Sequence, residues 1–99
     1  MHKFELVFTK FANEDLVKLQ NDRTNTKRLK AIYKALAYLQ ANPRHPSLNT
    51  HKYLGIKGVN SEDVFEAYAE NNTSGAYRIF WHYGVNKNQI TVIAIVPHP

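Results

Sequence analysis

An arginine in the middle of an aromatic segment is the residue whose type and position first point to chemistry. Residues 75–83 read Gly-Ala-Tyr-Arg-Ile-Phe-Trp-His-Tyr and alternate like a strand, so that Arg78, Phe80 and His82 share one face. A guanidinium on such a face needs an anion, a carboxylate or a ligand beside it. The segment therefore predicts either a phosphate-binding site or a plain cross-strand ion pair.

Two further residues supply groups that would work with Arg78. If residues 64–69 and 76–83 form a hairpin around a loop at 70–75, Glu66 lies directly opposite Arg78. His98 follows the last predicted strand, and by alternation it emerges near the same patch. The same register pairs Tyr68 with Ala76 and Val64 with Phe80.

Arginine, histidine and glutamate on one open surface are the groups that transesterification of RNA requires. A base removes the proton of the 2′-hydroxyl, a cation stabilises the charge on the phosphate, and an acid protonates the leaving 5′-oxygen. The sequence leaves open whether the base is Glu66 or one of the histidines His45, His51 and His82. On the plain alternative, His98 is an ordinary surface residue.

Other residues are candidates for contact with a substrate. Lys52 and Lys57 are either exposed loop lysines or phosphate-positioning groups, and Tyr68, Phe80 and His82 complete the predicted substrate surface. A stripe of lysines on the second helix is a solvated face, an edge that tracks RNA or a docking ridge for an acidic partner: Lys27, Lys30 and Lys34. The histidines show no metal-ligand spacing, so we expect neither a metal nor a cofactor.

A strand, two helices and then a run of strands must position these groups. A strand at 3–9 precedes two helices, which end near residue 21 and at Asn42-Pro43. Strands at 51–56, 64–69, 76–83 and 89–96 follow, joined by short turns, and such a meander is antiparallel. We expect one α+β domain over 1–99, with a helical hairpin on one face of a mainly antiparallel sheet of four or five strands. The Arg78 face would then be a shallow open surface.

The composition sets limits on the function. The chain has no cysteine, which excludes disulfides and thiolate metal sites. Its longest apolar run, residues 93–97, is too short to span a membrane, and its N-terminus does not read as a signal peptide, so we expect a cytoplasmic protein without a membrane partner. The net charge of +5 permits a nucleic acid or an acidic protein as partner.

The element order, the segment from Gly75 to Trp81 and the ending Ile-Val-Pro-His98 resemble the RelE/ParE superfamily of bacterial toxins. The resemblance implies a microbial-ribonuclease-like domain that, in the RelE, YoeB and HigB branches, cleaves messenger RNA in the ribosomal A site. It also implies a cognate antitoxin that wraps and neutralises the toxin. Arg78 matches the family's phosphate-holding arginine, and His98 matches the position of its catalytic histidine or arginine.

The resemblance leaves competing functions. The ParE branch shares the fold and inhibits DNA gyrase, whereas Arg78 together with His98 favours the nuclease branch, with Glu66 as the tentative base. A catalytically inactive member would only bind its antitoxin. In a purely structural domain, the pair of Arg78 and Glu66 would only fix the sheet.

Overall fold

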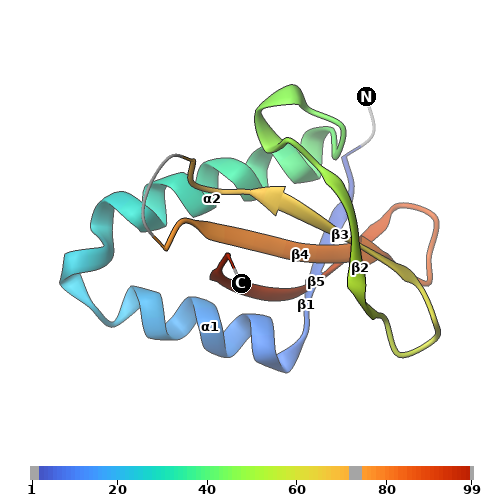
Figure 1. The fold of residues 1–99 in the computed structure, drawn as a ribbon, viewed down its shortest axis with the longest axis horizontal. Coiled ribbons are helices and arrows are strands. Elements are labelled where there is room, and N and C mark those ends of the chain that lie inside the picture. The colour runs from blue at the N-terminus through green and yellow to red at the C-terminus, as the bar shows by residue number, and fades with distance from the viewer. Residues whose placement is uncertain (1–2, 72–74, 99) are drawn as a thin grey trace.

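The computed structural model describes residues 3–71 and 75–98, which form a five-stranded sheet and two long helices (Figure 1). The α+β architecture expected from the sequence is confirmed. Short 3-10 turns at Arg23–Asn25 and Pro46–Leu48 follow α1 and α2. No helix in the described ranges is long and apolar enough to cross a membrane. The main elements are β1 (Glu5–Phe8), α1 (Lys10–Gln20), α2 (Thr26–Ala41), β2 (His51–Lys57), β3 (Asp63–Tyr68), β4 (Tyr77–Tyr83) and β5 (Gln89–Pro97).

The strands lie in the order β1-β5-β4-β3-β2. β1 runs parallel to β5, and all other neighbours are antiparallel. β5 therefore lies between two strands, as its apolar residues on both faces predict. The edge strands of the sheet are β1 and β2.

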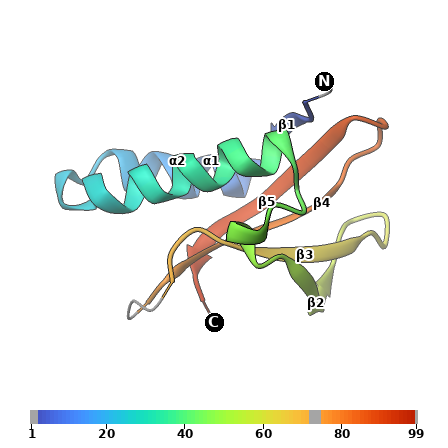
Figure 2. The same cartoon turned by 90° about the horizontal axis from the view of Figure 1, so that it is seen from above.

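Both helices pack on the same side of the sheet (Figure 2). Thr9 starts α1, because its side-chain oxygen accepts a hydrogen bond from the Ala12 backbone N–H. The apolar stripes of α1 and α2 then meet one face of β4 and β5. The core they form includes Leu19, Ile32, Leu36, Leu39, Ile79, Trp81, Ile90, Val92 and Ile95. The predicted division of β4 is confirmed, since Ile79 and Trp81 belong to this core while Arg78 lies on the opposite face.

The register of the β3–β4 hairpin differs from the prediction by two residues. Tyr68, rather than Glu66, lies opposite Arg78, and Glu66 lies opposite Phe80. The hairpin is centred one residue later than predicted, because the polar loop residues do not determine how many of them form the turn. Residues 72–74 of that loop lie outside the described ranges. An even shift leaves every side chain on its predicted face. The patch therefore keeps its members although the opposed pairs change.

The Arg78 face is less open than predicted. Phe80 is only 4% exposed, and the Tyr53 ring from β2 meets the Phe80 ring edge-on, with the ring centroids 5.0 Å apart. Val64, Glu66 and His82 on this face are also buried. Side chains of β2 thus cover much of the surface that the helices leave free.

Candidate active site

A buried carboxylate is the centre of the candidate site. The Glu66 side chain is 1% exposed, and each of its oxygens meets an imidazole. Oε2 lies 2.8 Å from His98 Nδ1, and Oε1 lies 2.8 Å from His51 Nε2. Both imidazoles are about half exposed. One carboxylate thus holds two solvent-facing histidines, one from β2 and one that follows β5.

Arg78 lies beside the same carboxylate, with its Nε 3.7 Å from Glu66 Oε2. Its guanidinium carbon lies 3.7 Å from the centre of the Tyr68 ring, and Nη1 donates a hydrogen bond of 2.6 Å to the Glu70 carbonyl oxygen. The side chain is 8% exposed, and Nε has no hydrogen-bond partner within the described ranges. A fixed positive charge therefore lies next to the carboxylate that holds both histidines.

Strand pairing brings these residues together. His51 lies opposite Glu66 in the β2–β3 pair, Tyr68 lies opposite Arg78, and Arg78 lies opposite Val96. His98 is anchored at the end of β5 by a hydrogen bond from its backbone N–H to the Ala76 carbonyl. Residues of β2, of β4 and of the segment after β5 thus converge on Glu66 of β3.

The hydrogen bonds distinguish the two histidines. His98 uses Nδ1 for Glu66, and its Nε2 has no hydrogen-bond partner in the part of the chain that the structure describes. A carboxylate that binds one imidazole nitrogen orients the ring and leaves the other nitrogen for a substrate. His51 instead meets oxygens at both nitrogens, because Nδ1 lies 3.0 Å from the Asn49 carbonyl. Both of these oxygens can only accept, so a hydrogen bond at either nitrogen of His51 requires a proton on that nitrogen.

Burial changes the role that Glu66 can have. A general base must reach the proton it abstracts. Both Glu66 oxygens are occupied by histidines and the side chain is 1% exposed, so the carboxylate holds the imidazoles in place rather than meeting a substrate. Among the histidines that the sequence left open as the base, His51 is the one in contact with Glu66. His45 stacks on Tyr38 at 3.9 Å instead.

The predicted substrate-contacting residues are only partly at the site. Tyr68 is there, beneath Arg78 and edge-on to His51 at 5.9 Å. His82 is 7% exposed, and its Nδ1 lies 2.7 Å from the Tyr83 carbonyl, so it does not present a free ring to RNA. Phe80 is buried too, and Tyr53 is the ring nearer to solvent at that position.

The lysines of the β2–β3 hairpin pair with an acid of their own. Lys52 and Lys57 both form ion pairs with Asp63 and are half exposed. The hydrogen bond from Lys57, followed by that from Lys52, lowers the pKa of the Asp63 carboxyl below its ordinary value. Neither lysine contacts the Glu66 cluster within the described residues. Their predicted role in phosphate positioning would require RNA that extends beyond the cluster.

Sequence reasoning missed Glu70 and Tyr53. The Glu70 carboxylate accepts hydrogen bonds from Arg28 Nε at 2.9 Å and from the Tyr77 backbone N–H at 3.0 Å, and its carbonyl holds Arg78. An acid at the first position of a predicted hairpin loop was the available signal. Tyr53 carried none, because its contact with Phe80 depends on how β2 pairs with β3.

Comparison with known proteins identifies solved structures that share this fold. No family model matches the sequence, and the search of curated proteins found no match. The structure is similar to a YoeB/ParE toxin from Agrobacterium tumefaciens, with a TM-score of 0.70, 16% identity and coverage of 96% of this chain and 99% of that chain. A YoeB dimer from Staphylococcus aureus matches at 0.63 with 18% identity, covering 98% of this chain and 99% of that chain. RelE in the archaeal RelE–RelB complex from Pyrococcus horikoshii matches at 0.64 with 14% identity, covering 96% and 94%. The chain therefore has the fold of the RelE/ParE superfamily toxins.

Proposed function

We propose that this protein is the toxin of a toxin–antitoxin system and an endoribonuclease that cleaves messenger RNA in the ribosomal A site. The observation that carries the proposal is the buried Glu66 carboxylate, which holds two half-exposed histidines beside a fixed arginine. The fold similarity to YoeB and RelE toxins supports the same reading.

The chemistry is a transesterification within the RNA. His51, after its Nε2 exchanges Glu66 for the substrate, takes the proton of the 2′-hydroxyl, and the 2′-oxygen attacks the adjacent phosphorus. The bond from phosphorus to the 5′-oxygen breaks, and protonated His98 gives that oxygen a proton from Nε2. Arg78 stabilises the charge on the phosphorane, and Glu66 positions His98 during the reaction and His51 before the substrate binds. The products are a 2′,3′-cyclic phosphate and a free 5′-hydroxyl.

Contacts with the RNA backbone would come from lysines. Lys27, Lys30 and Lys34 are exposed on α2, and the chain carries a net charge of +5. Such charges hold RNA without regard to sequence and make binding sensitive to salt. Phe80 and His82 are left out of the proposed RNA surface because both are buried.

An antitoxin is the proposed protein partner. One of the similar structures is a RelE–RelB complex. In the present structure, highly exposed apolar side chains from three segments line a common groove of about 470 Å³ beside α1: Phe11, Val59 and Val85. Large exposed apolar patches mark surfaces that a partner covers.

Induced expression tests the proposal. Wild-type protein should arrest growth and leave cleaved transcripts that primer extension maps, whereas R78A and H98A should do neither while circular dichroism shows that they fold. R23A is the matched control, because Arg23 is exposed and lies in the turn between the helices. If R78A and H98A stay fully toxic, the mechanism is wrong. Supercoiling defects without cleaved RNA would instead indicate a gyrase inhibitor.

A further inference from the structure

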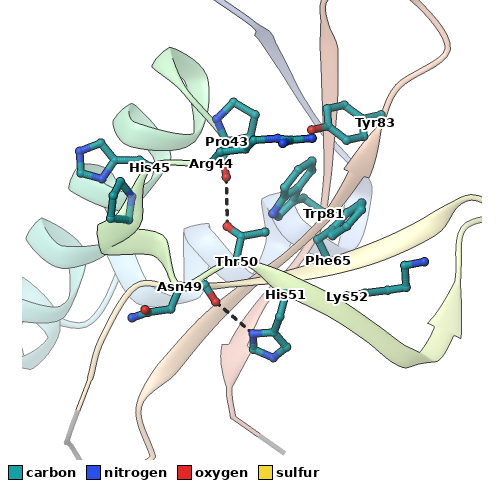
Figure 3. A pocket seen from close by; sticks show the side chains of 11 residues that line it. Pro43, Arg44, His45, Asn49, Thr50, His51, Lys52, Phe65, Trp81 and Tyr83 are labelled. Atoms are coloured by element: carbon teal, nitrogen blue, oxygen red, sulfur yellow. Dashed lines mark hydrogen bonds between the residues drawn. The ribbon is translucent and has the colours of Figure 1, made fainter.

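A second hollow lies next to the Glu66 cluster, around the edge of the sheet. It encloses about 510 Å³ between the loop that follows α2 and strands β2, β3 and β4 (Figure 3). That volume lies within the range of about 300–1,000 Å³ typical of small-ligand sites. Apart from His51, the mechanism proposed above uses none of the residues that line it.

Aromatic side chains form one wall of this cavity. The rings of Phe65 and Trp81 stack with centroids 4.9 Å apart, and Tyr83 meets Trp81 edge-on at 5.0 Å. Tyr83 is 43% exposed, so part of its ring faces solvent. Planar ligands such as nucleobases bind to walls of this kind by stacking.

Arginine, lysine and histidine side chains also line the cavity. Arg44, His45, His51 and Lys52 line the cavity, and no acidic residue is among the lining side chains of the described chain. Figure 3 shows the Arg44 side chain extending across the cavity toward Tyr83. Arg44 is exposed and forms no ion pair with any residue in the described ranges. Charge and shape together suit an anionic, aromatic ligand.

Trp81 adds a hydrogen-bond donor without a partner. Its Nε1 is buried and makes no hydrogen bond to the described residues, although the side chain lines the cavity. A buried donor left unpaired is costly, so such a group needs an explanation. A ligand with an acceptor near the indole would satisfy it after a small adjustment of the wall.

His51 connects the cavity with the candidate active site. It lines the cavity, and its Nε2 contacts Glu66. The two sites lie on opposite faces of the sheet at its β2 edge, because side chains of successive rows alternate in face: Lys52, Phe65 and Trp81 form one row, and His51 and Glu66 belong to the next. A strand of RNA that bends around the β2 edge would therefore meet both sites in turn.

We propose that this cavity binds one nucleotide of single-stranded RNA beside the scissile phosphate, with its base stacked on Tyr83 and its phosphate held by Arg44 and Lys52. The proposal rests on the proposed function for the identity of the ligand. It assigns the choice of RNA sequence to the cavity, whereas the Glu66 cluster performs the cleavage.

The tryptophan provides a direct assay, because Trp81 is the only one in the chain. The four ribonucleoside 5′-monophosphates and a hexanucleotide with 2′-O-methyl riboses, which cannot be cleaved, are titrated at low salt. We expect Trp81 emission to change, with different affinities for different bases. A fluorescently labelled copy of the hexanucleotide gives affinities by anisotropy.

Matched variants locate the binding. Y83A and R44A should each weaken hexanucleotide binding roughly tenfold, as expected for a lost stacking or phosphate contact. Y33A and R23A, at similarly exposed positions on the helical side, should bind like wild type. Y83F keeps the ring and should retain affinity, which guards against misfolding of Y83A.

The outcomes separate this proposal from the proposed function. If H98A binds the hexanucleotide with a change in Trp81 emission, but the wild type cleaves no transcript in cells, the nucleotide site is supported and the nuclease proposal fails. If the wild type cleaves RNA but emission is constant and R44A binds normally, the nucleotide site is wrong. Binding of peptides but not nucleotides would also overturn it.

Discussion

Replacement of the buried charged pair Glu66 and Arg78 by neutral side chains is the most informative perturbation of this structure. Three variants are compared: E66Q, R78M and the double variant. Each single change removes one charge and leaves the other buried, since the side chains are 1% and 8% exposed. The double change replaces both charges with neutral side chains of similar size.

The expected magnitudes follow from burial. Removal of one partner of a buried ion pair costs about 3–5 kcal/mol, and the Nε–Oε2 distance of 3.7 Å places this pair at the lower end. For a domain of this size, roughly 3 kcal/mol lowers the melting temperature by about 12–24 °C. Replacement of a whole buried pair is often near neutral. The double variant should therefore be more stable than either single variant.

Urea denaturation and thermal melting measure the effect, and RNA cleavage is assayed on the same samples. We expect all three variants to lose cleavage, including the stable double variant, because each lacks the phosphate-stabilising charge of Arg78, the histidine anchor of Glu66, or both. A double variant as unstable as the sum of the single changes would refute the reasoning that the two charges are coupled. A stable double variant that still cleaves RNA would refute the catalytic roles.

Further predictions concern smaller changes. H51A and H98A should each abolish cleavage while the free energy of unfolding falls by only about 1.5–3 kcal/mol, the value of one hydrogen bond to a charged group; urea melts measure this. K57M should raise the pKa of Asp63 toward its ordinary value in an NMR titration. Because that pKa is lowered in the folded state, its contribution to stability is present above the ordinary pKa and lost as the pH falls through the folded value. G75A should cost about 1–2 kcal/mol in chemical denaturation, because residue 75 has φ of 64°.

Controls make these results interpretable. K87A, in the exposed β4–β5 turn, should change neither cleavage nor stability. G75N should cost less than G75A, because asparagine tolerates the left-handed conformation and a side chain there meets nothing within 4 Å. An unchanged Asp63 titration in K57M, or equal stability of G75A and wild type, would contradict the respective argument.

Alternation alone located most of the candidate site. It placed Glu66, Tyr68 and Arg78 on one face, and this survived a wrong register because the error was an even number of residues. The sequence could not identify His51, rather than His45 or His82, as the partner of Glu66, since this pairing is a long-range contact of an edge strand. Local pattern carries no information on such pairing, nor on how far β2 covers Phe80.

The place of β5 has a consequence for how the protein is made. β5 lies between β1 and β4, yet it is the last strand in the sequence. A nascent chain that has reached residue 88 holds two helices and a β2–β4 meander, but β1 still has no neighbour with which to pair. The sheet closes only after residues 89–97 are available, and His98 follows directly. A ribosome that synthesises this protein would thus meet a folded active site only after it has translated almost all of the residues seen here.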